Sequence, residues 1–215
     1  MELFFAPLAC SMSARIALNE AGVAINLVEV DTHAKRVLAT GQDYRAINPL
    51  GYVPALRLDD GTVLTENSAI LQYIAEQYPE AQLAPPASDR VGRAKLRQWL
   101  SFTSAELHKG LMTPLLGDKT PPEVKAWTVA KYAPRLAYLD EKLKGREYLL
   151  DRFSVADAYL ATVLNWTRAT PEIDIAAYPN VKAYLERMRA RPSVASALAT
   201  EIPLFQAEAA RRKAA

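Results

Sequence analysis

The single cysteine of the chain, Cys10, is the residue whose type and position most clearly suggest chemistry. It lies in the stretch PLACSMSARI, where a short apolar segment at residues 2–5 gives way to a helical pattern. A thiol at a helix N-terminus is close to the positive end of the macrodipole and to unpaired backbone N–H groups, and both favour the thiolate. The alternative is a small hydrophobic residue buried under the helix, and this stretch alone does not separate the two interpretations.

A second chemical signal is the stretch NPLGYVPAL at residues 48–56, which holds two X-Pro bonds and one glycine. Pro54 opens an expected strand, where proline donates no ladder hydrogen bond. A cis Val53–Pro54 bond in a tight turn is one solution, and it leaves the Val53 N–H and C=O to pair with a peptide ligand as an added strand would. The alternative is a trans proline at the start of the strand, which the statistics of X-Pro bonds favour.

A third signal is the strand-to-helix junction TENSAI at residues 65–70. Its Glu66, Asn67 and Ser68 side chains are suited to hold an ammonium group or to donate to a carboxylate, and helix N-termini bind anions. An ordinary helix cap is the simpler interpretation of this stretch on its own.

The elements that position these residues alternate between strand and helix. Apolar residues at positions 14, 17, 18 and 21 predict a helix that Gly22 ends. The expected order is a strand at 2–5, a helix at 11–21, a strand at 24–30, an irregular and in part helical stretch, a strand at 55–58, a turn at 59–61, a strand at 63–64 and a helix at 67–78. We therefore predict a compact α/β domain at residues 1–80.

The remainder of the chain shows only helical periodicity. Paired prolines in AQLAPPAS disfavour a helix and mark a linker at residues 81–88. Beyond it we predict an all-helical domain at residues 89–215, with helices at 89–113, 121–144, 155–168, 178–190 and 192–200. Ser154 and Asp157 form a capping box at the start of the third helix, and we expect their role to be structural because the carboxylate is engaged with backbone amides.

Composition and charge exclude several classes of protein. One cysteine forms no internal disulfide, which suits a reducing cytoplasm, and the longest charge-free apolar run, residues 158–167, is far shorter than the roughly 20 residues that cross a bilayer. Residues 1–80 carry 5 basic and 10 acidic side chains, and the rest of the chain carries 21 and 14. The basic residues are dispersed among acids without a basic-aromatic motif. We therefore expect a soluble cytoplasmic protein with neither a nucleic-acid nor a membrane partner.

Five motifs in this order are more specific than any one of them. They are PLACSMSARIAL, INPLGYVPAL, TENSAILQYIAE, AELHKG and FSVADAYLATVLNW. In this set the sequence resembles the cytosolic glutathione transferases, in particular the bacterial beta class. The resemblance implies the glutathione transferase fold, an α/β thioredoxin-like N-terminal domain followed by an all-α C-terminal domain, and it implies a homodimer.

The resemblance also implies roles for individual residues. Cys10 would face the sulfur of glutathione, the Val53 backbone would pair with its cysteinyl part, and Lys35 would reach its glycyl carboxylate. Glu66 and Asn67 would hold the γ-glutamyl end, with the cis or trans Pro54 as a structural residue. The expected glutathione site comprises Cys10, Lys35, Tyr52, Val53, Glu66, Asn67, Ser68 and His108.

His108 in AELHKG matches a histidine that borders the same site in beta-class relatives, and it would favour a thiolate as a hydrogen-bond donor. Without the family context, an ordinary surface histidine is the simpler interpretation. The expected electrophile pocket lies between the domains and is formed by Leu8, Met112, Leu115, Leu116 and Trp166, for most of which core packing is the alternative. No metal is implied.

The leading functional hypothesis is conjugation of glutathione, as a co-substrate, to small hydrophobic electrophiles in detoxification. Phe4 and Phe5 stand near the place where other classes use a tyrosine, so that mechanism is not expected. One alternative is a glutathione-dependent thiol-disulfide reductase or peroxidase that uses Cys10. Another is a ligand carrier or interaction module that has lost catalysis.

Overall fold

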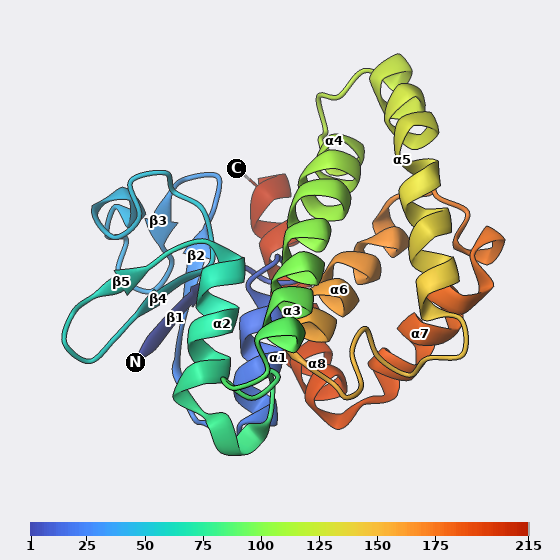
Figure 1. Cartoon of the computed structure of the whole chain (residues 1–215). Coiled ribbons are helices and arrows are strands. Elements are labelled where there is room, and N and C mark those ends of the chain that lie inside the picture. Colours follow the sequence, from blue (N-terminus) through green and yellow to red (C-terminus); the bar gives the residue numbers. More distant parts are fainter. Residues whose placement is uncertain (215) are drawn as a thin grey trace. The chain divides into compact units, whose positions relative to one another are not determined.

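The computed structural model describes residues 1–214, which form two compact units (Figure 1). The first unit contains Met1–Leu83 together with the C-terminal helix α8 (Pro192–Ala214), and the second is Ala84–Arg191. Within the described residues, no helix has both the length and the apolar character that a membrane crossing requires.

The first unit is built on a five-stranded sheet with the order β3-β2-β1-β4-β5. Its strands are β1 (Glu2–Phe5), β2 (Asn26–Asp31), β3 (Arg36–Val37), β4 (Ala55–Arg57) and β5 (Val63–Leu64). The central strand β1 runs parallel to β2 and antiparallel to β4, and the register places Leu3 beside both Leu27 and Leu56. The Leu3, Phe4 and Phe5 side chains are buried, so this strand anchors the core.

Two helices follow the strands as the periodicity predicts. Helix α1 (Met12–Glu20) makes the crossover between the parallel strands β1 and β2, and Gly22 ends it with a φ of +67°. Helix α2 (Asn67–Gln77) packs against α1 and β4 (Figure 1), and the 3-10 turn η2 (Pro79–Ala81) follows it. The stretch expected to be irregular contains the 3-10 helix η1 (Tyr44–Ala46) and also β3, which at two residues is too short to leave a pattern in the sequence.

The C-terminal helix α8 packs on α1 and belongs to the first unit, whereas the sequence grouped residues 192–215 with the other helices. The Asn19 amide donates to the Ser193 carbonyl at 3.1 Å, and Arg211 pairs with Glu29 at 2.8 Å. The helix also continues past Pro203, beyond the predicted end at residue 200. Periodicity identifies a helix but not its packing partner, which here lies more than 170 residues earlier in the chain.

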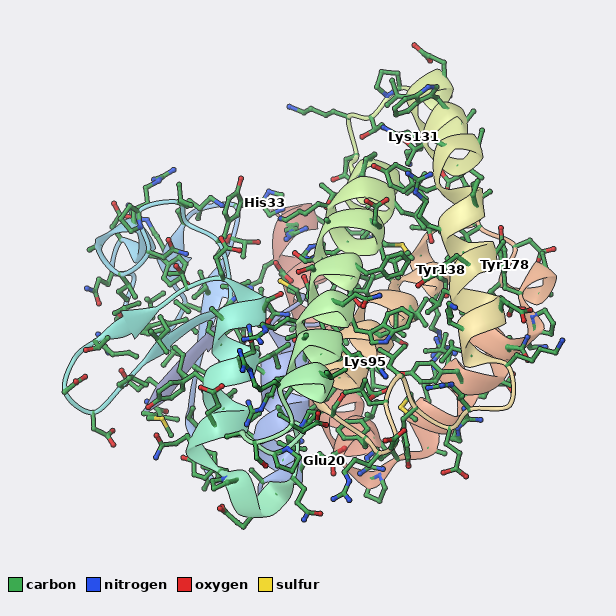
Figure 2. The ribbon with its side chains drawn as sticks, viewed as in Figure 1. Glu20, His33, Lys95, Lys131, Tyr138 and Tyr178 are labelled. Carbon is green, nitrogen blue, oxygen red and sulfur yellow. The ribbon has the colours of Figure 1, made fainter. Side chains whose placement is uncertain are left out.

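The second unit is entirely helical, as predicted. Its elements are α3 (Arg90–Phe102), the π-helical segment η3 (Thr103–Met112), α4 (Thr113–Leu116), α5 (Pro122–Leu143), α6 (Val155–Asn165), η4 (Trp166–Ala169), η5 (Ile175–Ala177) and α7 (Pro179–Ala190). All residues of α6 are buried, so α6 is the central helix of this unit. Tyr138 of α5, labelled in Figure 2, packs its ring against Trp99 and Phe102 of α3.

The predicted capping box is present at the start of α6. Asp157 accepts hydrogen bonds from the backbone N–H and the hydroxyl of Ser154, each at 2.9 Å. It also accepts from the Leu149 N–H and the Tyr184 hydroxyl, each at 2.9 Å. Burial raises the pKa of Asp157 to about 6 against the effect of these donors. The carboxylate therefore ties the preceding loop and α7 to the central helix.

Candidate functional site

Cys10 lies in the turn between β1 and α1, directly before Ser11, the N-cap residue of α1. Its thiol donates to the Val53 carbonyl with a distance of 3.2 Å from Sγ to oxygen. The Cys10 carbonyl accepts from the Ser13 hydroxyl at 2.6 Å and from the Ser13 N–H at 3.1 Å. Two of the three chemical signals of the sequence, separated by 43 residues, therefore meet in the first unit.

The Val53–Pro54 peptide bond is cis. Of the two alternatives left open by the sequence, the trans form favoured by statistics is thus wrong. The Tyr52 carbonyl in the same loop accepts from the buried Tyr44 hydroxyl at 2.9 Å and from the Asn48 amide at 2.7 Å. Burial raises the pKa of Tyr44, so its hydroxyl stays protonated as a donor. Sequence reasoning missed Tyr44 and Asn48, although Asn48 lies inside the NPLGYVPAL motif.

Lys35 lies beside this loop. Its Nζ donates to the Gly51 carbonyl at 3.0 Å and lies 5.4 Å from the centre of the Tyr52 ring. Gly51 has a φ of +66°, and a Cβ atom there would lie 2.8 Å from Lys35 Cδ. The positive φ favours glycine at residue 51, and a larger residue there would displace the Lys35 side chain. The neighbouring His33 is exposed (Figure 2).

The third signal is at the N-terminus of α2, where Glu66, Asn67 and Ser68 lie in succession. The Glu66 side chain is exposed, and its carbonyl accepts the Ala69 and Ile70 N–H groups. Asn67 is buried, and its side-chain amide exchanges hydrogen bonds with the Ser13 hydroxyl at 2.9 and 3.1 Å. The Asn67 side chain thus joins α2 to α1 immediately after Cys10.

Left-handed backbone conformations are concentrated near these residues. Among the described residues other than glycine, φ is positive at Leu8, Lys35, Glu66 and Gln82, with values of 56°, 56°, 65° and 53°. Each such conformation costs on the order of 1–3 kcal/mol and persists only where the surrounding structure holds it. Leu8, Lys35 and Glu66 belong to the predicted site, so local strain is a further signal that this part of the first unit is functional.

In the second unit, His108 lies in the π-helical segment η3, a type of helix that is frequent at functional sites. Its Nδ1 atom is 2.7 Å from the Tyr159 hydroxyl, and its ring meets the Trp166 ring edge-on with centres 4.9 Å apart. Burial lowers the pKa of His108 to about 4, with a smaller contribution from Lys109. The imidazole is therefore neutral near pH 7.

The expected pocket residues differ in exposure. Met112 and Leu115 are buried in the manner of core residues, whereas Leu116 is 38% exposed. Trp166 is half-buried beside His108, and Leu8 is half-buried in the first unit. In the part of the chain that the structure describes, no three His, Cys, Asp or Glu side chains are grouped to hold a metal ion.

Comparisons with known proteins match both units. A family model described as the N-terminal domain of glutathione S-transferase matches residues 3–82, and one described as its C-terminal domain matches residues 103–192. The glutathione S-transferase GstA of Escherichia coli O157:H7 is 44% identical over 202 residues, which cover 94% of this chain and 98% of GstA.

Two solved structures are similarly close. A sphingomonad glutathione S-transferase complexed with glutathione has a TM-score of 0.87 and 44% identity, covering 94% of this chain and 98% of its own. A beta-class glutathione S-transferase of Sphingomonas chungbukensis has the same TM-score of 0.87, identity of 44% and coverage of 94% and 98%.

Proposed function

Because this chain belongs to the glutathione S-transferase family, in its bacterial beta class, we propose that it conjugates reduced glutathione to small hydrophobic electrophiles. The observation that carries the proposal is the contact between the Cys10 thiol and the Val53 carbonyl in the loop of the cis proline. This contact places a thiol next to a backbone suited to pair with a short peptide. The glutathione bound to a relative of similar fold supports the same ligand.

The charged groups of the proposed glutathione site are opposite in sign to the groups of glutathione that they would bind. The exposed Glu66 carboxylate suits the ammonium of the γ-glutamyl end, and the Lys35 ammonium suits the glycyl carboxylate. The Val53 backbone pairs with the cysteinyl part, and Tyr52 covers the Lys35 side. Because the Asn67 side chain is engaged with Ser13, we propose that Asn67 and Ser68 act through their N–H groups at the start of α2.

The proposed reaction is a nucleophilic substitution or addition. The glutathione thiol loses its proton to solvent, and the thiolate forms a C–S bond. In a substitution the leaving group departs with its electron pair, and in an addition to an epoxide or an enal the displaced electron pair stays on the electrophile, which takes a proton from solvent. His108 acts as a neutral hydrogen-bond donor to the thiolate, because its low pKa keeps the imidazole uncharged. Most of the rate gain then comes from placing the thiolate and lowering its pKa.

A thiol-disulfide reductase or peroxidase activity is the second candidate, and the partial exposure of Cys10 favours it. The Cys10 thiolate would attack a glutathione mixed disulfide and release the thiol of the other partner. A second glutathione would then resolve the enzyme-glutathione disulfide and leave as oxidised glutathione. We also propose that the protein works as a homodimer in the cytoplasm. A carrier or interaction module without catalysis is the remaining alternative.

Calorimetric titration of the protein with reduced glutathione near pH 7, with light scattering in the same buffer, tests the proposal. We expect one glutathione per subunit of a dimer, followed by conjugation to aryl halides, epoxides or enals. Lys35→Ala and Glu66→Ala should weaken binding, whereas Lys95→Ala, on the exposed side of α3 (Figure 2), serves as a charge-matched control. Absence of glutathione binding would overturn the proposal in favour of the non-catalytic module.

A further inference from the structure

A buried acid on the C-terminal helix contacts the loop that precedes Cys10. Glu201 of α8 has no exposed surface, and its Oε2 accepts the Leu8 N–H at 2.7 Å. The two residues are 193 positions apart in sequence, and both belong to the first unit. A buried carboxylate is costly unless it is paired and hydrogen-bonded, and Glu201 meets both conditions through Arg15 and the Leu8 N–H.

The hydrogen bond falls on a strained turn. The Ala9 N–H closes the turn by donating to the Ala6 carbonyl at 3.2 Å, with Pro7 and Leu8 between them. Leu8 has a φ of 56° at the third position, where a type II turn usually has glycine. A branched side chain in this conformation is unfavourable. The Glu201 carboxylate therefore accepts the N–H of Leu8, which is the residue of this turn with the strained backbone.

The same turn leads directly to Cys10. The Ser11 hydroxyl bonds to Ala6 at its carbonyl and N–H, at 3.2 and 3.3 Å, and the Met12 N–H donates to the Ala9 carbonyl at 3.0 Å. Residues 6–12 thus form one hydrogen-bonded unit. Its conformation sets where the thiol lies relative to Val53 and the first turn of α1.

We propose that Glu201 is a positioning residue for Cys10, which fixes the thiol by accepting the Leu8 N–H and so holding the left-handed turn. The inference rests on the proposed function, because it assigns Glu201 to the same glutathione site. It adds a residue from the far end of the chain to that site, supplied by a helix that the sequence grouped with the other domain.

The charges around Glu201 show what the carboxylate balances. From α1, Arg15 forms an ion pair with it, with Nη1 3.5 Å from Oε1. Elsewhere along α8, Ser193 binds Glu20 at the end of α1 (Figure 2), Arg211 pairs with Glu29 of β2, and Arg212 pairs with Glu208. Burial raises the pKa of Glu201 to about 7, opposed by the Leu8 N–H and Arg15. Its charge therefore changes near neutral pH.

Alkylation of Cys10 by iodoacetamide tests this role without requiring transferase activity. Cys10 is the single cysteine, so the rate followed by mass spectrometry between pH 6 and pH 9 reports on one thiol. The variants are Glu201→Leu, which removes the acceptor, and Glu201→Gln, which keeps a neutral one. Glu208→Leu is the matched control, because Glu208 is also buried on α8 but pairs with its own helix.

We expect Glu201→Leu to alkylate about tenfold more slowly at pH 8, because loss of the charge-assisted hydrogen bond releases the turn that holds Cys10 at the N-terminus of α1, a position that favours the thiolate. Glu208→Leu should match the wild type. The alkylation rate of Glu201→Gln should match that of the wild type near pH 6. It should become lower than the wild-type rate as the pH rises through 7, because only the wild type then carries a charge at residue 201.

The proposal would be overturned if Cys10 in Glu201→Leu were alkylated at the same rate as in the wild type, or if Glu208→Leu slowed the alkylation equally. If Glu201→Leu does not fold, the comparison with Glu201→Gln decides, and identical rates at every pH count against the role. Loss of glutathione binding by the wild type would instead overturn the proposed function, and it would leave the alkylation result unaffected.

Discussion

The Tyr159 hydroxyl lies 2.7 Å from Nδ1 of His108. A phenol is a stronger donor than a neutral imidazole N–H, and an imidazole nitrogen lone pair is a stronger acceptor than a phenol oxygen. The hydroxyl therefore donates to Nδ1, which leaves the imidazole proton on Nε2. Tyr159 in this way selects the tautomer whose Nε2–H is available to donate to a thiolate.

Without the Tyr159 hydroxyl, His108 should no longer be restricted to one tautomer, and the fold should remain intact. In Tyr159→Phe we expect kcat/KM for conjugation to fall about tenfold, and the ¹⁵N shifts of His108 should show a mixture of tautomers. Tyr184→Phe is the control, because this buried tyrosine of the same unit bonds to Asp157 and not to the histidine. An unchanged ¹⁵N spectrum in Tyr159→Phe would contradict the assignment.

His108 should remain neutral over the working range of pH. Burial lowers its pKa from 6.5 to about 4, so the folded state resists protonation between these values. Stability contributed by the neutral form is therefore present above pH 6.5 and is lost as the pH falls toward 4. Titration by NMR should show no His108 transition between pH 5.5 and pH 8. A His108 midpoint near 6.5 is the contrary result.

Glu201 should have the opposite effect on stability. Its pKa is raised from 4.5 to about 7, so the folded state binds this proton more tightly than the unfolded chain does. The associated stabilisation is complete below pH 4.5 and is lost as the pH rises through 7. Relative to Glu201→Gln, the wild type should lose up to about 3 kcal/mol of unfolding free energy across this window. Urea unfolding at pH 5 and pH 8 measures the difference, and Glu208→Gln supplies the background.

Replacement of Cys10 should separate the two enzymatic candidates. In Cys10→Ala, disulfide reductase activity should vanish, because no protein thiol is left to form the mixed disulfide. Conjugation should survive in part, since glutathione brings its own thiol. Both activities are measured with the same preparation, and Ser11→Ala, which changes the neighbouring hydroxyl, serves as a control for damage to the loop. Full reductase activity in Cys10→Ala would exclude Cys10 from that reaction.

Substitution of Gly51 by alanine should lower glutathione affinity more than the same substitution at other glycines of similar conformation. Gly51→Ala forces a methyl group into the Lys35 side chain, so Lys35 should be displaced and glutathione affinity should fall several-fold. Gly41→Ala is the control, because Gly41 has a comparable φ of +70° but no neighbour within 4 Å. Both variants should lose about 1–2 kcal/mol of stability, because alanine is unfavourable in the left-handed region. Equal glutathione affinity in the two variants would argue against a binding role for Lys35.

The local features of the chain are readable from its sequence. The helix ended by Gly22, the strand at residues 2–5 and the capping box of Ser154 and Asp157 each depend on residues a few positions apart, and the structure has all of them. The motifs around Cys10 and Val53 also indicated the family, because each motif is a short run of contiguous residues that can be read directly from the sequence.

Only the tertiary structure decided which distant groups meet. The cis form of the Val53–Pro54 bond, the burial of Asn67 against Ser13 and the support of Tyr52 by Tyr44 depend on neighbours from other elements. The packing of α8 on α1, which carries Glu201 to the Leu8 N–H, spans nearly the whole chain. Periodicity and capping rules describe interactions along one element, whereas these contacts are selected by the packing of several elements at once. For that reason the sequence determined the elements and the chemical groups, and the fold decided which of them act together.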